Sequence, residues 1–226
     1  MPRMRTVKTG LWQSLPVVTR SIIAFCVVVY LFTWLTNLTS AEYQFGMSPV
    51  DVAMGQWWRL LTATFLHASA MHILFNMYAV LVLGASLERV IGGPRFAAIY
   101  FMSALGGSVA ALWFSGLDTI SVGASGAVFG LMTATIVVGR RMSIDTSQII
   151  FWLGLNVLIG FLAPDIDWRA HLGGAVVGAI TAYALLGSAR TAQKQATRWL
   201  TVGLIFVTLI VEILVRNQQI LTYLGR

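Results

Sequence analysis

The chain has 226 residues, of which 58% are hydrophobic and only 10% are charged, and its mean hydropathy is +0.80. Because about 25% of the residues in soluble globular domains are charged, this composition excludes a soluble enzyme. The formal net charge of +7 would suggest a nucleic-acid partner in a soluble chain, but here the basic residues lie between long apolar segments. The sequence therefore predicts a polytopic membrane protein with no nucleic-acid partner.

Seven apolar stretches approach the roughly 20 residues that a helix needs to cross a bilayer. Glycine, proline and paired arginines separate them, as at 92–94 and 140–141. We therefore expect an all-α membrane helix bundle with a short cytoplasmic segment at 1–18, six spans within 19–187, and a linker, a seventh span and a short outward tail at 188–226. The stretches lie near residues 19–36, 70–87, 95–114, 124–140, 148–163, 170–187 and 199–215.

Basic residues are concentrated on one side of these spans. If the spans alternate in direction, eleven of the fifteen Lys and Arg residues lie on the side of the N-terminus. The positive-inside rule then places the N-terminus in the cytoplasm and the C-terminus outside, in what we expect to be a bacterial plasma membrane. The eleven residues are Arg3, Arg5, Lys8, Arg20, Arg89, Arg95, Arg140, Arg141, Arg190, Lys194 and Arg198, and the other side keeps Arg59, Arg169, Arg216 and Arg226.

The first span permits a second interpretation. A basic segment precedes it and the stretch 39–41 (TSA) follows it, an arrangement that imitates a secretory signal with a cleavage site. We expect an uncleaved anchor instead, because six further spans already direct the chain to the membrane. The outward loop at 37–69 is apolar enough to lie in the membrane interface, with Trp57 and Trp58 at the level of the lipid headgroups.

A polar side chain inside a membrane span is costly and is therefore a functional candidate, and four such side chains lie near the outer starts of the predicted spans. His72 and Asn76 lie one turn apart in span two, Ser125 begins span four, and His171 begins span six. These spans all run from outside to inside, so we expect the four side chains to share the outer leaflet. A serine hydroxyl needs an adjacent base, usually histidine, which predicts a Ser125 and His171 dyad. A backbone N–H near Ser125, together with His72 and Asn76, would hold the oxyanion of a tetrahedral intermediate.

Glycines at small-xxx-small spacing lie beside the serine and the histidine. Gly126 and Gly130 are four residues apart in span four, as are Gly174 and Gly178 in span six, and this spacing lets helix backbones approach closely. Ordinary helix packing is the alternative interpretation of either pair alone. Three histidines without a carboxylate or cysteine at ligand spacing predict no metal site, and we expect no cofactor.

These motifs together resemble the rhomboid family of intramembrane serine proteases. The matching segments are 56–59 (QWWR), 67–76 (HASAMHILFN), 123–126 (GASG) and 170–174 (AHLGG), with Gly178 after the last. They come in order on alternate spans, and the resemblance covers nearly the whole chain. It implies a six-helix core formed by spans one to six, to which the seventh span is a C-terminal addition.

The resemblance also implies roles for individual residues. Ser125, preceded by Gly123 in its motif, resembles the family nucleophile, and His171 resembles its general base. His72 and Asn76 resemble the oxyanion-stabilising pair.

One residue departs from the family pattern. Many bacterial members carry a tyrosine, stacked on the base, four residues after the nucleophile, where this chain has Phe129. The aromatic ring is kept, so we expect Phe129 to stack on His171 and hold the imidazole in place. Asp167 lies four residues before His171 and could orient it, but we expect a solvated loop acid.

The function that the resemblance implies is hydrolysis of peptide bonds in transmembrane segments of other membrane proteins, on the outward side. Small and helix-breaking residues at the scissile bond would expose its carbonyl. The alternative is an inactive relative that binds transmembrane clients, although such relatives typically lose the serine or the histidine. A transporter or channel is disfavoured because no charged residue lies near mid-bilayer and no two halves repeat. The oligomeric state, the substrate and the gating element stay open.

Overall fold

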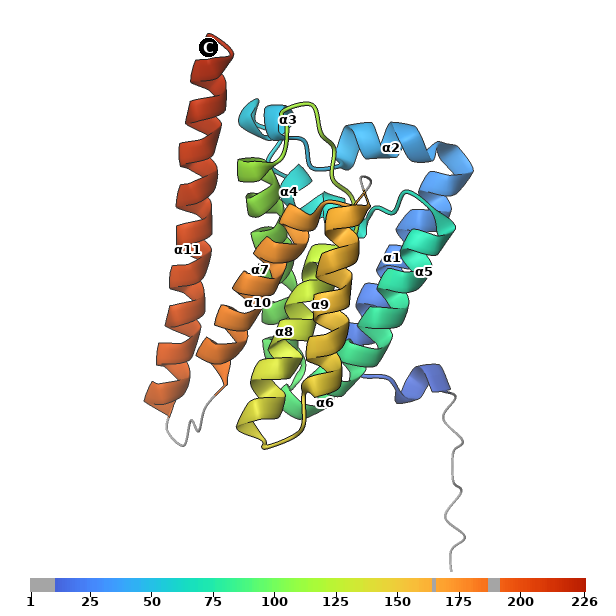
Figure 1. The fold of residues 1–226 in the computed structure, drawn as a ribbon, viewed down its shortest axis with the longest axis vertical. Helices are drawn as coiled ribbons and strands as arrows, with labels where there is room; N and C mark the ends of the chain where they lie inside the picture. The colour runs from blue at the N-terminus through green and yellow to red at the C-terminus, as the bar shows by residue number, and fades with distance from the viewer. Residues whose placement is uncertain (1–10, 164–165, 187–191) are drawn as a thin grey trace, which may run out of the picture.

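The computed structural model describes residues 11–163, 166–186 and 192–226 (Figure 1). Most of the segment predicted at 1–18 lies outside the described residues, as do residues 188–191 of the linker after span six. Four of the eleven basic residues used for the topology also lie outside them: Arg3, Arg5, Lys8 and Arg190.

Helices dominate the described part of the chain, and its β structure is an isolated bridge between Met47 and Ser121. This confirms the predicted all-α class. In chain order the elements are η1 (Leu11–Ser14), α1 (Val17–Thr36), α2 (Leu38–Phe45), α3 (Pro49–Ala53), α4 (Arg59–Thr62), η2 (Ala63–Phe65), α5 (Ala70–Ala79), η3 (Val80–Gly84), α6 (Ala85–Ile91), α7 (Gly93–Phe114), α8 (Ser125–Arg141), α9 (Ser147–Leu162), α10 (Trp168–Leu185) and α11 (Ala192–Tyr223).

Six of the seven predicted stretches match one helix, or the continuous run of α5, η3 and α6, within about four residues at each end, while the seventh, near 199–215, is the middle of the 32-residue helix α11. In the described ranges, four are long and apolar enough to cross a membrane: α1, the run Ala70–Ile91, α7 and α11. Helix α9 is apolar but has only 16 residues, and α8 and α10 have 17 and 18. The count of six core spans plus one therefore stays a prediction.

Helices α8 and α10 occupy the interior of the bundle. Helix α10 packs mainly against α7 and α8, while α11 packs at the side against α3, α7 and α10 (Figure 1). A helix enclosed by other helices meets little lipid, so it need not be apolar on every face. This is consistent with the glycines and the polar residues Ser125 and His171 lying on the central helices α8 and α10.

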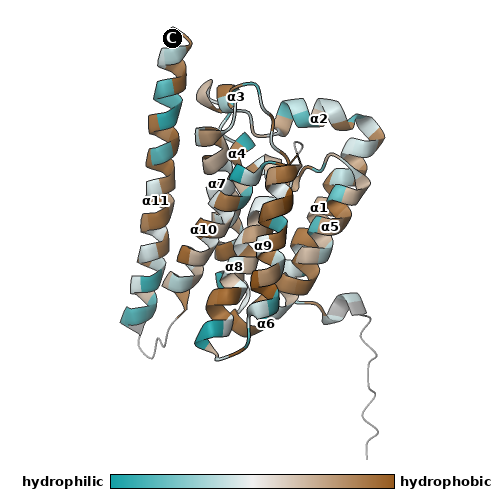
Figure 2. Ribbon diagram, viewed as in Figure 1, coloured by the Kyte–Doolittle hydropathy of each residue, from teal (hydrophilic) through white to brown (hydrophobic). Residues whose placement is uncertain are grey.

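The outer helices present apolar side chains outward. In α1, Phe32 and Leu35 are 66% and 74% exposed, and Leu204 in α11 is 66% exposed. Figure 2 shows hydrophilic residues gathered at the two ends of α11 and at the lower end of α8, with hydrophobic residues between them. An exposed apolar band between polar ends is the pattern of a membrane-embedded bundle.

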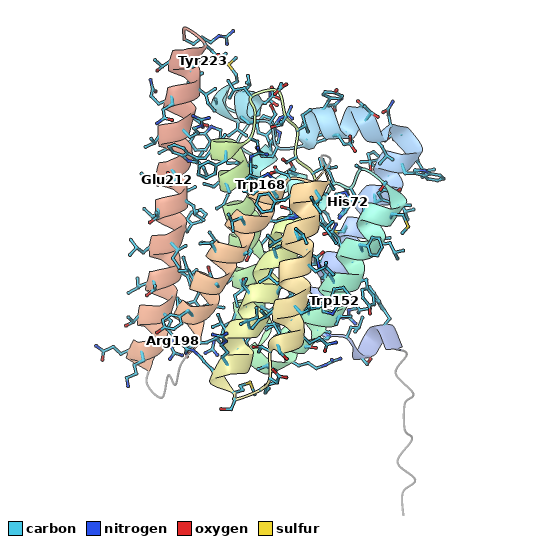
Figure 3. The ribbon with its side chains drawn as sticks, viewed as in Figure 1. His72, Trp152, Trp168, Arg198, Glu212 and Tyr223 are labelled. Carbon is cyan, nitrogen blue, oxygen red and sulfur yellow. The ribbon has the colours of Figure 1, made fainter. Side chains whose placement is uncertain are left out.

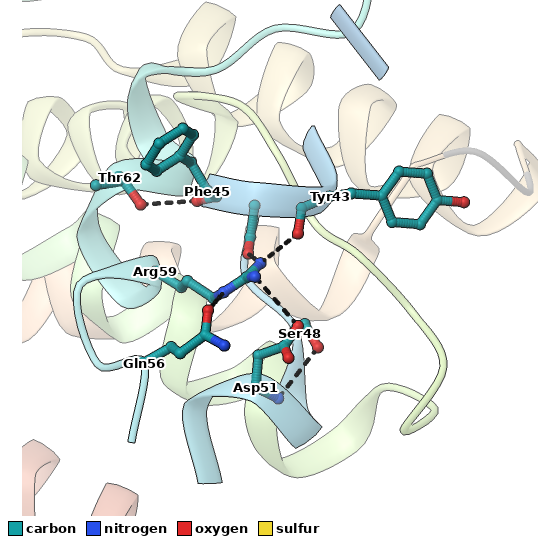
Figure 4. Close-up of polar contacts among 8 residues, drawn as sticks. Tyr43, Phe45, Ser48, Asp51, Gln56, Arg59 and Thr62 are labelled. Carbon is teal, nitrogen blue, oxygen red and sulfur yellow. Dashed lines mark hydrogen bonds and ion pairs between the residues drawn. The ribbon is translucent and has the colours of Figure 1, made fainter. Parts of the chain in front are cut away.

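The first loop folds into short helices around a buried arginine. Arg59 is 4% exposed, and its guanidinium donates to the carbonyls of Tyr43 and Gly46 at 2.8 and 2.9 Å. It also donates to the Gln56 side chain at 2.7 Å and lies 3.3 Å from the Asp51 carboxylate (Figure 4). Because one planar group binds acceptors from three parts of the loop, the loop has a fixed shape over the end of the bundle.

The second apolar stretch is a single helical run with a π-helical middle. Segments α5 and α6 are joined by η3, whose hydrogen bonds run from i to i+5. Near the end of the run, Glu88 is 7% exposed. Its carboxylate accepts from the N–H groups of Val18 and Thr19 at 2.9 and 2.7 Å, and from the Thr19 hydroxyl at 2.8 Å. Glu88 therefore satisfies the first turn of α1 and ties α6 to it.

Candidate active site

The turn before α8 is fixed by the first loop. Met47 and Ser121 exchange two backbone hydrogen bonds of 2.9 Å, and the Gly123 N–H donates to the Ala63 carbonyl at 2.9 Å. Gly123 has a φ of +122°, a conformation that favours glycine over any residue with a Cβ. Helix α8 then begins at Ser125, which is half-buried.

Helices α8 and α10 are in backbone contact beside Ser125. A Cβ at Gly174 would lie 2.9 Å from the Gly126 Cα and would overlap its carbonyl, and a Cβ at Gly178 would lie 2.7 Å from the Gly130 carbonyl oxygen. One turn further along, the Thr133 hydroxyl donates to the Ala175 carbonyl at 2.7 Å. At these four glycines the backbones of α8 and α10 are therefore too close to leave room for a side chain.

A further glycine completes this contact. A Cβ at Gly107 in α7 would lie 2.8 Å from the Ala170 carbonyl oxygen and 3.4 Å from the Gly126 Cα. Gly107 was not singled out in the sequence, although the Gly-Gly pair at 106–107 in the middle of an apolar span was a signal for it. Three helices thus meet next to the first turns of α8 and α10.

His171 lies in the first turn of α10 and is 8% exposed. Its ring is stacked on the Phe129 ring, with centroids 4.1 Å apart and an interplanar angle of 15°. Its buried Nδ1 atom has no hydrogen-bond partner in the described part of the chain, and a Cβ at Gly160 in α9 would lie 3.6 Å from this atom. A small cavity of about 20 Å³ adjoins the ring, between α9 and α10.

Asp167 caps the helix that carries His171. Its carboxylate accepts from the N–H groups of Arg169 and Ala170 at 3.2 and 3.3 Å, and also from the Ser121 hydroxyl. The side chain is half-buried. The expectation of a solvated loop acid was therefore wrong, because two unsatisfied N–H groups at the start of α10 bind this carboxylate.

His72 and Asn76 enter the site from α5. Ser69 caps this helix by accepting from the His72 N–H at 3.2 Å, and the His72 Nε2 lies against Gly123, where a Cβ would be only 2.6 Å away. Asn76 is 7% exposed, and its Nδ2 donates to the His72 carbonyl at 2.9 Å. Figure 3 shows His72 at the same end of the bundle as Trp168, the first residue of α10, while Arg198 lies at the opposite end.

His67 supports His72 from the first loop. The two rings lie edge to face with centroids 5.2 Å apart, and His67 is 1% exposed. Burial, with a smaller contribution from His72, lowers the pKa of His67 from 6.5 to about 3. His67 is therefore a neutral, buried ring at neutral pH.

The start of α8 offers hydrogen-bond donors beside the serine. The first N–H groups of a helix have no partner within it, and the helix dipole is positive at this end. In the described part of the chain the Ser125 hydroxyl and the His171 ring share no hydrogen bond. Such bonds are often long in unliganded sites and shorten when substrate binds.

Comparison with known proteins identifies the family. Residues 54–188, more than half of the chain, match the Rhomboid domain. The chain is 39% identical over 139 residues to Rhomboid protease GluP of Bacillus subtilis (strain 168), a match that covers 59% of this chain and 27% of GluP. It is 30% identical over 193 residues to Rhomboid protease AarA of Providencia stuartii, covering 71% and 68% of the two chains.

A plant relative shows a similar match. The chain is 37% identical over 140 residues to RHOMBOID-like protein 2 of Arabidopsis thaliana, which covers 58% of this chain and 43% of that protein. The chain thus spans less than half of two of these three relatives. With the matched domain, the apolar helices and the ordered motifs, the chain is an integral membrane protein that belongs to the rhomboid family.

Proposed function

We propose that this chain is an intramembrane serine endopeptidase that cleaves transmembrane segments of other membrane proteins at the outer-leaflet side. The observation that carries the proposal is the contact between the starts of α8 and α10, where Ser125 adjoins Gly126, His171 adjoins Ala170, and a Cβ at Gly126 would lie 3.2 Å from the Ala170 carbonyl oxygen. The names of GluP and AarA, both rhomboid proteases, support it.

In the proposed reaction each site residue has a distinct role. The Ser125 Oγ attacks the carbon of the scissile carbonyl while His171 accepts the hydroxyl proton. The resulting oxyanion is held by the Ser125 N–H at the positive end of α8, with His72 and Asn76 as side-chain donors. Collapse of this intermediate breaks the C–N bond, and His171 returns the proton to the departing amine. A water molecule then hydrolyses the acyl-enzyme by the same route.

The proposed substrate follows from the need for Ser125 to reach the carbonyl carbon of the scissile bond. A carbonyl within an intact helix already accepts an N–H and is shielded by side chains, so the scissile region must leave the helix before attack. Small and helix-breaking residues lower the cost of that step. We therefore assign single transmembrane segments with locally weak helices as substrates, in a bacterial plasma membrane with the N-terminus of this chain in the cytoplasm.

A serine-reactive probe tests the mechanism directly. A fluorophosphonate should label the purified wild-type protein and should not label Ser125→Ala, while Ser86→Ala, which changes an exposed serine in α6, should label normally. His171→Ala should lose both labelling and cleavage of a transmembrane reporter. The double variant should be no worse than either single variant, because the two residues act as a unit.

Two outcomes would reject the proposal. Cleavage of the reporter by Ser125→Ala would exclude Ser125 as the nucleophile. An unlabelled wild-type protein that still retains a transmembrane client on co-purification would favour the inactive binding protein instead.

A further inference from the structure

A second cavity lies at the end of the bundle opposite Ser125. It has a volume of about 530 Å³ and opens between α6, the start of α7, the end of α8 and the residue after α10. Helix α8 runs from Ser125 to Arg141, so at 1.5 Å per residue the cavity is roughly 24 Å from the serine along the helix. It is therefore separate from the candidate active site.

The lining of this cavity combines two arginines with apolar side chains. Arg95 in the first turn of α7 and Arg141 at the end of α8 supply the positive charge, and the apolar lining includes Val90, Met142 and Leu186. Val90 and Met142 are 54% and 52% exposed. An apolar surface thus continues from the cavity to the outside of the bundle.

In the part of the chain that the structure describes, no carboxylate forms an ion pair with the two arginines of the cavity. The ion pair found within the described ranges joins Arg59 to Asp51, in the first loop at the opposite end of the bundle, and involves neither cavity arginine. Of the acidic residues at the cavity end, Glu88 is bound to the start of α1 and Asp145 to Ser147.

One of the two arginines is held in position by the neighbouring helix. The Arg141 guanidinium lies over the Tyr183 ring, 4.7 Å from its centroid, and donates to the Tyr183 carbonyl at 3.4 Å. These contacts use part of its five donors and leave the others available. An arginine that is already oriented loses less freedom when it binds a phosphate.

We infer that this cavity binds the phosphodiester headgroup of an anionic glycerophospholipid from the adjacent leaflet. Arginine pairs recognise phosphate oxygens with charge-assisted hydrogen bonds, and basic pockets between helices on the cytoplasmic side are known sites for anionic headgroups. The headgroup lies between Arg95 and Arg141, and the acyl chains follow the exposed apolar surface past Val90 and Met142. A free phosphate would bind the arginines but would leave that apolar surface unused.

The bound lipid would join parts of the bundle that are far apart in the sequence. Its headgroup would contact the start of α7 and the end of α8, and its chains would contact α6. The site does not depend on peptidase activity, so its test is independent of the proposed function.

Native mass spectrometry of the full chain in detergent measures this binding. The protein is titrated with phosphatidylglycerol, with phosphatidylcholine carrying the same acyl chains, and with inorganic phosphate. The test variant is Arg95→Gln with Arg141→Gln. The matched control is Arg89→Gln with Arg140→Gln, which removes the same charge from the same end of the bundle at residues that do not line the cavity. Circular dichroism and gel filtration check that each variant is folded.

The expected result is retention of phosphatidylglycerol in preference to phosphatidylcholine by the wild-type protein and the control. The test variant should bind phosphatidylglycerol about tenfold or more weakly, because each basic side chain near an anionic lipid contributes roughly fivefold in affinity. Equal weakening in both double variants would overturn the site, since it would reflect general surface charge. Binding of inorganic phosphate that displaces the lipid at equal concentration would identify a free anion as the ligand and overturn the lipid assignment.

Discussion

The Phe129 ring lies nearly parallel to the His171 ring, with their centroids 4.1 Å apart. Phe129 is one turn after Ser125 on α8, so a single helix presents both the proposed nucleophile and the surface on which the proposed base rests. Since the Nδ1 atom of His171 has no hydrogen-bond partner in the described residues, no acidic side chain fixes the imidazole. We therefore expect the stacking contact to orient this ring.

Substitutions of Phe129 separate stacking from simple packing. Phe129→Tyr should keep near-normal turnover of a transmembrane reporter, because the ring is retained. Phe129→Leu, which fills most of the volume without a ring, should lower kcat with little change in folding stability. Phe129→Ala should lose most activity and also leave a cavity that costs roughly 3 to 5 kcal/mol. Wild-type kcat in Phe129→Leu would show that the residue only fills the core.

Loss of the Asn76 amide should slow the reaction without stopping it. Removing one oxyanion donor typically lowers kcat by about 10² to 10³, and the Ser125 N–H and His72 would remain, so we expect roughly the lower end of this range for Asn76→Ala. Asn156→Ala is the control, because Asn156 in α9 makes the same bond to the carbonyl four residues earlier, at 2.8 Å, on an exposed face. Unchanged turnover in Asn76→Ala on several substrates would remove Asn76 from the oxyanion site.

The contact between α8 and α10 leaves no room for a methyl group at Gly174. Gly174→Ala should force the two helices apart, lower the free energy of unfolding by roughly 1 to 3 kcal/mol and reduce labelling by the serine probe. Gly154→Ala is the matched control, since a Cβ at Gly154 in α9 would meet nothing within 4 Å. Thermal unfolding in detergent measures both, and equal stability of the two variants would contradict the packing argument.

Protonation of His67 should make the fold sensitive to acid. Its pKa is about 3 in the folded chain and about 6.5 in an unfolded chain. The unfolded state therefore binds a proton first as pH falls, and the stabilisation is present above pH 6.5 and lost as pH falls toward 3. Between pH 7 and pH 5 the loss should be about 2 kcal/mol. His67→Phe should show a correspondingly smaller loss over this interval, and identical pH profiles would refute the assignment.

Most helices of the bundle could be predicted, because a helix of 16 or more residues carries enough apolar residues for its composition to stand out. Six of the seven apolar stretches were located within about four residues at each end by composition and turn signals, and the seventh underestimated α11 by seven residues at its start and eight at its end. The helices of the first loop, α2, α3 and α4, have eight, five and four residues, too few for a periodic pattern. Ser48 followed by Pro49 was a start signal for α3, but what fixes the loop is Arg59, whose partners lie up to 16 residues away.

The residues of the candidate site could be proposed from the sequence wherever the residue type itself suggests a chemical role. Ser125, His171, His72 and Asn76 are polar groups in apolar spans, which makes them conspicuous. Asp167 was misjudged, although an Asp just before the predicted span six was a sequence signal for a helix cap. Only its contact with Ser121, 46 residues away, had no signal in the sequence. The dyad geometry itself depends on how closely helices approach, which glycine spacing permits but does not specify.

The π-helical segment Val80–Gly84 determines how side chains at the two ends of its helical run are rotated relative to one another about the helix axis. Asn76 and Glu88 are twelve residues apart and both are buried, yet in an unbroken α-helix at about 100° per residue they would face directions about 120° apart. The extra residue of the π turn brings the two onto nearly the same face. Deleting one residue there would rotate one half by about 100°, and either the amide beside the serine or the carboxylate that holds α1 would face lipid. The length of this segment therefore couples the outer end of the span to the inner end.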